Sequence, residues 1–176
     1  MIRKTLIVFM LIMSSMIAGC STKIEDYKQS QPSLNLFEYF EGKIVAWGMV
    51  QDYTGAQTRR FSVDIVGTVQ GDTLTLVEDF IFADGETSQR IWTILRLEDG
   101  RYEGTAPDVI GKASGQEVGN ALYWEYEMDL VVDGDHYRVG FEDWMYRHDD
   151  KRLFNIAAIK KFGVEVGTVT LFFEKQ

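Results

Sequence analysis

Residues 120–132 read Asn-Ala-Leu-Tyr-Trp-Glu-Tyr-Glu-Met-Asp-Leu-Val-Val, and this stretch decides the fold. Its side chains alternate with a period of two. One set is apolar or aromatic (Leu122, Trp124, Tyr126, Met128, Leu130 and Val132), and the other is mostly acidic (Tyr123, Glu125, Glu127 and Asp129). Successive side chains of a β-strand point to opposite faces, so the pattern predicts a strand between an apolar interior and water.

The same period recurs on both sides of this stretch. Strand-like runs cover 43–52, 58–68, 73–83, 88–97, 101–106, 120–132, 136–147, 152–161 and 164–174. Turn sequences such as Asp84-Gly85 and Asp99-Gly100 separate them. Many strands joined by tight turns predict an all-β fold, with a single antiparallel β-barrel over residues 34–176. A membrane-spanning barrel would put the acids in its lumen, and alternation alone leaves that alternative open.

Two segments break the period. Residues 34–41 follow Pro32, precede Gly42 and carry an apolar face, which predicts a short helical turn capped by Ser33. Residues 107–119 contain four glycine or alanine positions and a serine. They predict a bent strand or a flexible loop, which could equally form a lid over a barrel mouth.

The N-terminus has the features of an export signal. Arg3 and Lys4 precede an apolar run that is too short to cross a bilayer comfortably. Ile17-Ala18-Gly19-Cys20 resembles a lipobox, so we expect residues 1–19 to be a lipoprotein signal peptide and Cys20 to be lipidated. The alternative is a plain secretory signal with an unrelated cysteine. Ser21 favours anchoring to the outer membrane, facing the periplasm. The polar residues 20–33 then read as the lipidated cysteine and a flexible tether.

Composition excludes several classes of function. The formal charge of −9 disfavours nucleic acid as a partner. Cys20 is the only cysteine, so no internal disulfide can form. His136 and His148 flank turns, and no cluster has metal-ligand spacing. We therefore expect neither a metal nor a cofactor, and we favour a protein without enzymatic activity.

Polar residues on otherwise apolar strand faces are the candidate site. The alternation places Glu78, Asp143 and Asn155 inward, while Trp124 and Tyr126 offer hydrogen bonds. Arg90 joins them if the Trp92 face of its strand is interior, and Arg60 is similarly ambiguous. Because a buried carboxylate needs a partner or a raised pKa, this set predicts either a polar patch that orients a ligand head group or a structural network. Acid–base catalysis by the two carboxyls is a third interpretation.

Gly42 and Trp47 resemble the first strand of calycin barrels, lipocalins included, in which such a pair seals the barrel base. Core packing is the role that we expect for Trp47.

A wider resemblance covers most of the chain after the tether. The chain resembles a family of proteobacterial lipoproteins known as domain of unknown function 3833, on short motifs: Phe40-Glu41-Gly42, Ala46-Trp47-Gly48, Gln51-Asp52, Arg59-Arg60-Phe61, Glu78-Asp79-Phe80, Asp84-Gly85, Arg90-x-Trp92, Gly104-Thr105-Ala106, Asp108-Val109-x-Gly111, Gly119-Asn120-Ala121, Trp124, Asp143-Trp144-Met145 and Lys161-Phe162-Gly163. The resemblance implies an envelope lipoprotein with a lipid connection, and it implies no reaction.

These patterns favour an envelope lipoprotein whose lipocalin-like barrel binds or carries a fatty acid or another apolar ligand. The alternative is a structural or interaction protein of the envelope that uses the acidic face around Glu125, Glu127 and Asp129. A lipid-modifying enzyme using Glu78 and Asp143 is the third hypothesis. The sequence leaves the oligomeric state open, and it leaves open whether the barrel is hollow.

Overall fold

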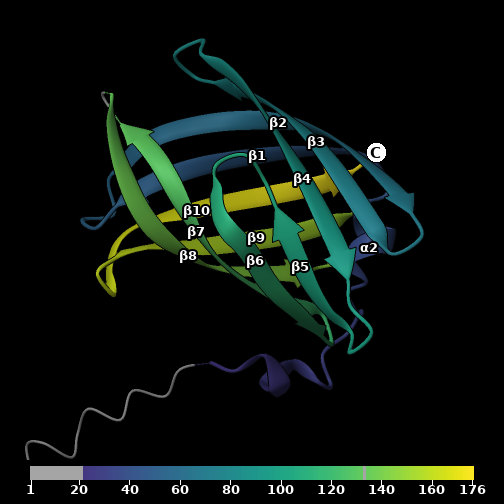
Figure 1. The fold of residues 1–176 in the computed structure, drawn as a ribbon. Coiled ribbons are helices and arrows are strands. Elements are labelled where there is room, and N and C mark those ends of the chain that lie inside the picture. Colours follow the sequence, from purple (N-terminus) through teal and green to yellow (C-terminus); the bar gives the residue numbers. More distant parts are fainter. Residues whose placement is uncertain (1–21, 133) are drawn as a thin grey trace, which may run out of the picture.

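The computed structural model describes residues 22–132 and 134–176, so the expected signal peptide and Cys20 lie outside the described residues. Ten strands of this part of the chain form one closed antiparallel barrel (Figure 1). The strands are β1 Gly42–Asp52, β2 Gln57–Gln70, β3 Thr73–Phe82, β4 Thr87–Arg96, β5 Arg101–Thr105, β6 Val109–Val118, β7 Ala121–Val132, β8 Asp135–Arg147, β9 Arg152–Lys161 and β10 Val164–Lys175. A 3₁₀-helix, η1 (Ile24–Tyr27), and a short helix, α2 (Leu36–Phe40), precede them.

Each strand pairs with the next strand in the sequence, which is an up-and-down order. The barrel closes where β1 pairs with β10, from Ile44↔Lys175 to Asp52↔Gly167. The prediction of a single antiparallel barrel with a short N-terminal helical turn is therefore confirmed.

The apolar face of β7 points into the barrel. Trp124, Tyr126 and Met128 are buried, whereas Glu125 and Glu127 are exposed to water. Outside, Glu127 forms an ion pair with Arg138 on β8, and Asp129 Oδ2 lies 2.7 Å from Nδ1 of His136. The alternative that put these acids in a lumen is wrong, and Arg138 on the neighbouring strand compensates part of the acidic row.

Residues 107–119 form a bent strand, and the alternative of a lid is wrong. Most of this segment is β6, whose pairing with β7 shifts register between Ile110 and Ser114. The small residues here make room for an aromatic ring. A Cβ atom on Gly115 or on Gly104 of β5 would overlap the indole of Trp124, which lies flat against this part of the wall.

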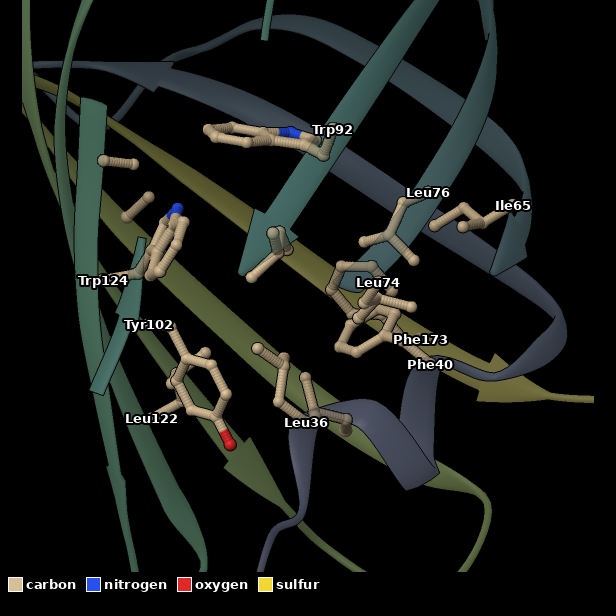
Figure 2. Close-up of a cluster of buried hydrophobic side chains, with 14 of the residues drawn as sticks. Leu36, Phe40, Ile65, Leu74, Leu76, Trp92, Tyr102, Leu122, Trp124 and Phe173 are labelled. Carbon is tan, nitrogen blue, oxygen red and sulfur yellow. The ribbon is translucent and has the colours of Figure 1, made fainter. Parts of the chain in front are cut away.

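The helix α2 closes one end of the barrel. Leu36, Phe37, Tyr39 and Phe40 are all buried, and Figure 2 shows Leu36 and Phe40 pointing up into the core beside Phe173. The Tyr39 hydroxyl donates hydrogen bonds to the carbonyl oxygens of Lys151 (2.9 Å) and Phe173 (3.3 Å). These contacts fix the helix across the barrel opening.

The cap of α2 differs from the expected one. Asn35, rather than Ser33, caps the helix, because its side-chain oxygen accepts from the backbone N–H of Glu38 at 3.1 Å. No helix within the described ranges is long and apolar enough to cross a membrane.

Part of the segment expected as a tether lies against the barrel. Tyr27 at the end of η1 packs its ring 5.8 Å from that of Trp144 and 5.5 Å from that of Tyr146. Further along, the backbone N–H of Leu34 donates to the Gly119 carbonyl at 2.7 Å. Residues 22–33 therefore follow the barrel surface, although their polar composition alone predicts a free linker.

The expected core role of Trp47 is wrong. Trp47 is 48% exposed on the outer face of β1 and stacks on Phe172 of β10, with ring centroids 6.1 Å apart. Its neighbours Ala46 and Ile44 occupy the inward positions instead. Both faces of β1 are apolar enough to face the interior. In the barrel, the face with the smaller side chains points inward.

The contact between Trp124 and the glycines of β5 and β6 can be tested by adding a methyl group to one of them. We expect Gly115→Ala to lower the free energy of unfolding by about 1–3 kcal/mol, because the added methyl group overpacks against the indole. Gly140→Ala is the matched control, since its Cβ meets no atom closer than 4.0 Å, and it should change stability by less than about 0.5 kcal/mol. Urea unfolding followed by circular dichroism measures both. Equal unfolding midpoints for the two variants would contradict this packing.

Candidate functional site

The barrel interior contains a cavity of about 300 Å³. This volume is at the lower end of the range for small-molecule sites. Its wall is mostly apolar and aromatic, and α2 and every strand except β5 and β6 contribute side chains to it. The cavity extends from Leu36 and Phe40 at the end closed by α2 toward Arg59 and Phe82 near the opposite end.

All six residues that the sequence singled out for the interior line this cavity: Glu78, Arg90, Trp124, Tyr126, Asp143 and Asn155. Trp124, Tyr126, Asp143 and Asn155 are buried, while Glu78 and Arg90 are half-buried and border the cavity. Their common orientation follows from the period of two, because each occupies an inward position of its strand.

The structure resolves the ambiguity of the two arginines. Arg90 shares the inward face of β4 with Trp92 and lies opposite Glu78 in the register of β3 and β4. Arg60 is exposed on the outer face of β2. The neighbouring Arg59 lines the cavity instead.

Arg90 is held by an aspartate that sequence reasoning missed. Its Nη2 and Nε lie 2.8 Å and 3.0 Å from Oδ2 of Asp108, in the connection between β5 and β6. The ladder between β4 and β5 runs from Thr93↔Thr105 to Arg96↔Tyr102, so Arg90 lies beyond the end of this short strand. Asp108 Oδ1 is buried without a hydrogen-bond partner in the described residues. The ion pair thus bridges the wall where β5 ends.

Glu78 is an inward carboxyl beside this ion pair. Burial raises the pKa of Glu78 to about 7, although the positive charge of Arg90 opposes the shift and Asp108 adds to it. The net effect is that the cost of desolvating the carboxylate exceeds the attraction of a guanidinium already engaged by Asp108. Glu78 therefore exchanges its proton near neutral pH.

Asp143 is the second inward carboxyl. The side-chain amide of Asn155 donates to Asp143 Oδ1 and to the Trp144 carbonyl oxygen (3.1 Å). Burial raises the pKa of Asp143 to about 7; the bond from Asn155 opposes this shift and the charge of Glu78 increases it. Each carboxyl thus lies within electrostatic range of the other, and below pH 7 both hold protons that they can donate.

Tyr126 lies within electrostatic range of both carboxyls. Its ring stacks on Phe141 at 5.0 Å and meets the edge of Trp92 at 5.5 Å. Burial raises the pKa of Tyr126 well above its usual value, and Asp143 adds to the shift. Its hydroxyl therefore remains protonated and serves as a hydrogen-bond donor or acceptor at the cavity wall.

Arg59 is the other cation at the cavity, and sequence reasoning missed it as well. Its guanidinium lies 3.4 Å from the centroid of the Phe82 ring. It also pairs with Glu86, and with Asp84 at 3.7 Å. The alternation of Phe61, Val63 and Ile65, extended by one step toward the N-terminus, would have identified Arg59. No group of three or more His, Cys, Asp or Glu in the described ranges is placed to hold a metal ion.

The raised pKa values predict how stability changes with pH. Between pH 5 and 7 the unfolded chain ionises both carboxyls while the folded state keeps its protons, so stability falls as pH rises. We expect the double variant Glu78→Gln/Asp143→Asn to flatten the dependence. Each carboxyl changes the free energy of unfolding by at most about 1.4 kcal/mol per pH unit. Glu125→Gln, on the outer face of β7, is the control. Urea unfolding at pH 5, 6, 7 and 8 measures the free energy of unfolding of each variant. If that free energy falls with pH as steeply in the double variant as in the wild type, Glu78 and Asp143 are not the source of the pH dependence.

Comparisons with known proteins identify the family of the chain. One solved structure that resembles the chain is described as "Odorant Binding Protein OBP1"; it is 12% identical, with a TM-score of 0.37, and the match covers 82% of this chain and 76% of that one. No curated protein sequence matches the chain. The family described as "Protein of unknown function (DUF3833)" matches residues 14–175, and the chain belongs to this family.

Proposed function

We propose that this protein is an outer-membrane lipoprotein whose barrel holds an apolar ligand, such as a fatty acid or another lipid. The observation that carries the proposal is the interior cavity, which combines an apolar wall with one polar cluster, Glu78, Arg90, Tyr126, Asp143 and Asn155. Such a combination supports a ligand with a long apolar part and a single polar end. Each methylene group buried in the wall would stabilise the complex by about 0.8 kcal/mol.

The charged residues around the cavity favour one kind of ligand head group. Arg90 is engaged by Asp108, and Arg59 is engaged by Glu86 and Asp84. Glu78 and Asp143 have no cation within ion-pair distance in the described part of the chain. A ligand carboxylate would have to displace Asp108 or lie among other acids. The cluster therefore suits a head group that donates hydrogen bonds: a hydroxyl, an amide, an ammonium or a protonated carboxyl.

Ligand binding can be measured with two probes that differ only at the head group. We expect hexadecylamine to bind about tenfold more tightly at pH 8.5 than at pH 6, because Glu78 and Asp143 ionise between these values. Hexadecanoic acid should show the opposite trend. The fluorescence of Trp92 and Trp124, which line the cavity, reports binding.

The variant Glu78→Gln should reduce the difference between the two pH values, while Glu125→Gln leaves it unchanged. If neither probe binds at either pH, as followed by native mass spectrometry, the ligand-binding proposal fails.

Membrane attachment is the second part of the proposal, and it rests on Ile17-Ala18-Gly19-Cys20. More than one acyl chain on Cys20 would give stable anchoring, whereas a single chain is marginal. We expect Cys20→Ala to move the protein from the membrane fraction to the soluble periplasmic fraction. Ser21→Asp should keep it on the inner membrane in enteric-type bacteria. Fractionation on a sucrose gradient followed by immunoblotting measures both, and membrane retention of Cys20→Ala would refute the anchor.

A further inference from the structure

The outside of the barrel carries a row of aromatic residues that the proposed ligand site does not use. Trp47 on β1 lies opposite Phe172 on β10, Phe172 lies opposite Phe154 on β9, and Phe154 lies opposite Tyr146 on β8. The rings of Phe154 and Phe172 are 5.2 Å apart. These strands are consecutive neighbours in the barrel wall (Figure 1).

Trp144 and Ile156 widen this row on β8 and β9, where they are register partners. We call the six residues Trp47, Phe172, Phe154, Tyr146, Trp144 and Ile156 the aromatic face. Trp47, Phe154 and Ile156 are 48%, 44% and 48% exposed. A contiguous exposed apolar surface of this kind marks a contact with a protein or a membrane.

The N-terminal segment identifies the contact. Tyr27 of η1 packs on Trp144 and Tyr146, so η1 adjoins the aromatic face. Ile24, the first residue of η1, is four residues from Cys20 in the sequence. Even a fully extended chain of this length spans only about 14 Å. A lipid on Cys20 would therefore hold the bilayer within about 14 Å of Ile24, on the side of the barrel where η1 adjoins the Trp144 and Tyr146 edge of the aromatic face.

The chemistry of the face suits the bilayer interface. Tryptophan and tyrosine combine an apolar ring with a polar group, and they concentrate at the level of lipid head groups. The net charge of −9 gives no attraction to anionic lipids, so the contact has to come from the apolar rings.

We propose that the aromatic face lies on the surface of the bilayer to which Cys20 is attached, with Trp47, Phe154 and Ile156 in the interfacial layer. The inference rests on the anchor of the proposed function and is independent of the ligand. The protein then has a fixed side toward the membrane, rather than hanging freely from a linker.

Quenching by brominated lipids tests this orientation. The purified mature protein, residues 20–176 lipidated at Cys20, is reconstituted in vesicles of phosphatidylethanolamine and phosphatidylglycerol whose acyl chains carry bromine near the head group. We expect clear quenching of tryptophan fluorescence in the wild type. The quenched signal should fall by more than half in Trp47→Phe, because Trp47 is 48% exposed whereas Trp144, the other tryptophan of the outer face, is partly covered by Tyr27.

Two double variants provide the matched comparison. Phe154→Ser/Ile156→Ser removes apolar side chains of the aromatic face and should reduce quenching, with Trp47 and Trp144 still present. Ile81→Ser/Ile91→Ser removes exposed side chains of β3 and β4 and should leave quenching at the wild-type level. Flotation with the vesicles and circular dichroism confirm that each variant is attached and folded.

The outcomes separate the two proposals. Protein that floats with the vesicles but shows no quenching keeps the anchor and overturns the membrane-facing side. A dimer that shields Trp47, detected by crosslinking on the vesicles, overturns it in favour of a second copy of the chain. Protein that does not float overturns the anchor, and this inference with it.

Discussion

The pairing of β1 with β10 is the constraint on which the rest of the structure depends. This ladder joins the first and last strands of the sheet from Ile44↔Lys175 to Asp52↔Gly167. Without it the sheet would have two open edges, and the inward face would be open to water along them. Closure gives each strand one enclosed face and one outer face. The cavity, the raised pKa values of Glu78 and Asp143, and the outer aromatic face all follow from that separation.

The width of the closed barrel also leaves room for charged side chains in its interior. Ten strands make a wider barrel than eight, and eight already leave room for a small ligand. The aromatic rings of Trp92, Trp124 and Tyr126 fill part of the interior, and space remains between them and the far wall. Where β5 ends early, the ion pair of Arg90 and Asp108 spans the wall. The Arg90–Asp108 ion pair, with Glu78 opposite Arg90, is thus located beside the short ladders of β5.

The period of two made much of this predictable. The alternation of β7 identified the barrel, and Glu78, Asp143 and Asn155 stood out because each interrupts an apolar face. The alternation could not orient β4, because Ile91 and Trp92 offer two comparable faces. It also misplaced Trp47, whose strand is apolar on both sides.

Contacts between distant segments were beyond sequence reasoning. Asp108 follows Pro107 in a connection without any period, and its partner Arg90 is eighteen residues away. Tyr27 lies in a polar stretch that resembles a linker, and only the rings of Trp144 and Tyr146 on β8 show where it docks. Such pairs are set by how the barrel closes, not by local propensity.

The two proposed contacts share the same strands. On β8, Asp143 points into the cavity while the next residue, Trp144, lies on the outer face. On β9, Asn155 points inward between Phe154 and Ile156, which point outward. The amide of Asn155 also bonds the backbone carbonyl of Trp144, so the polar cluster and the aromatic face are joined by one hydrogen bond through the sheet. The polar cluster and the aromatic face are thus two sides of the same two strands, because the period of two sends neighbouring residues of β8 and β9 to opposite faces of the wall.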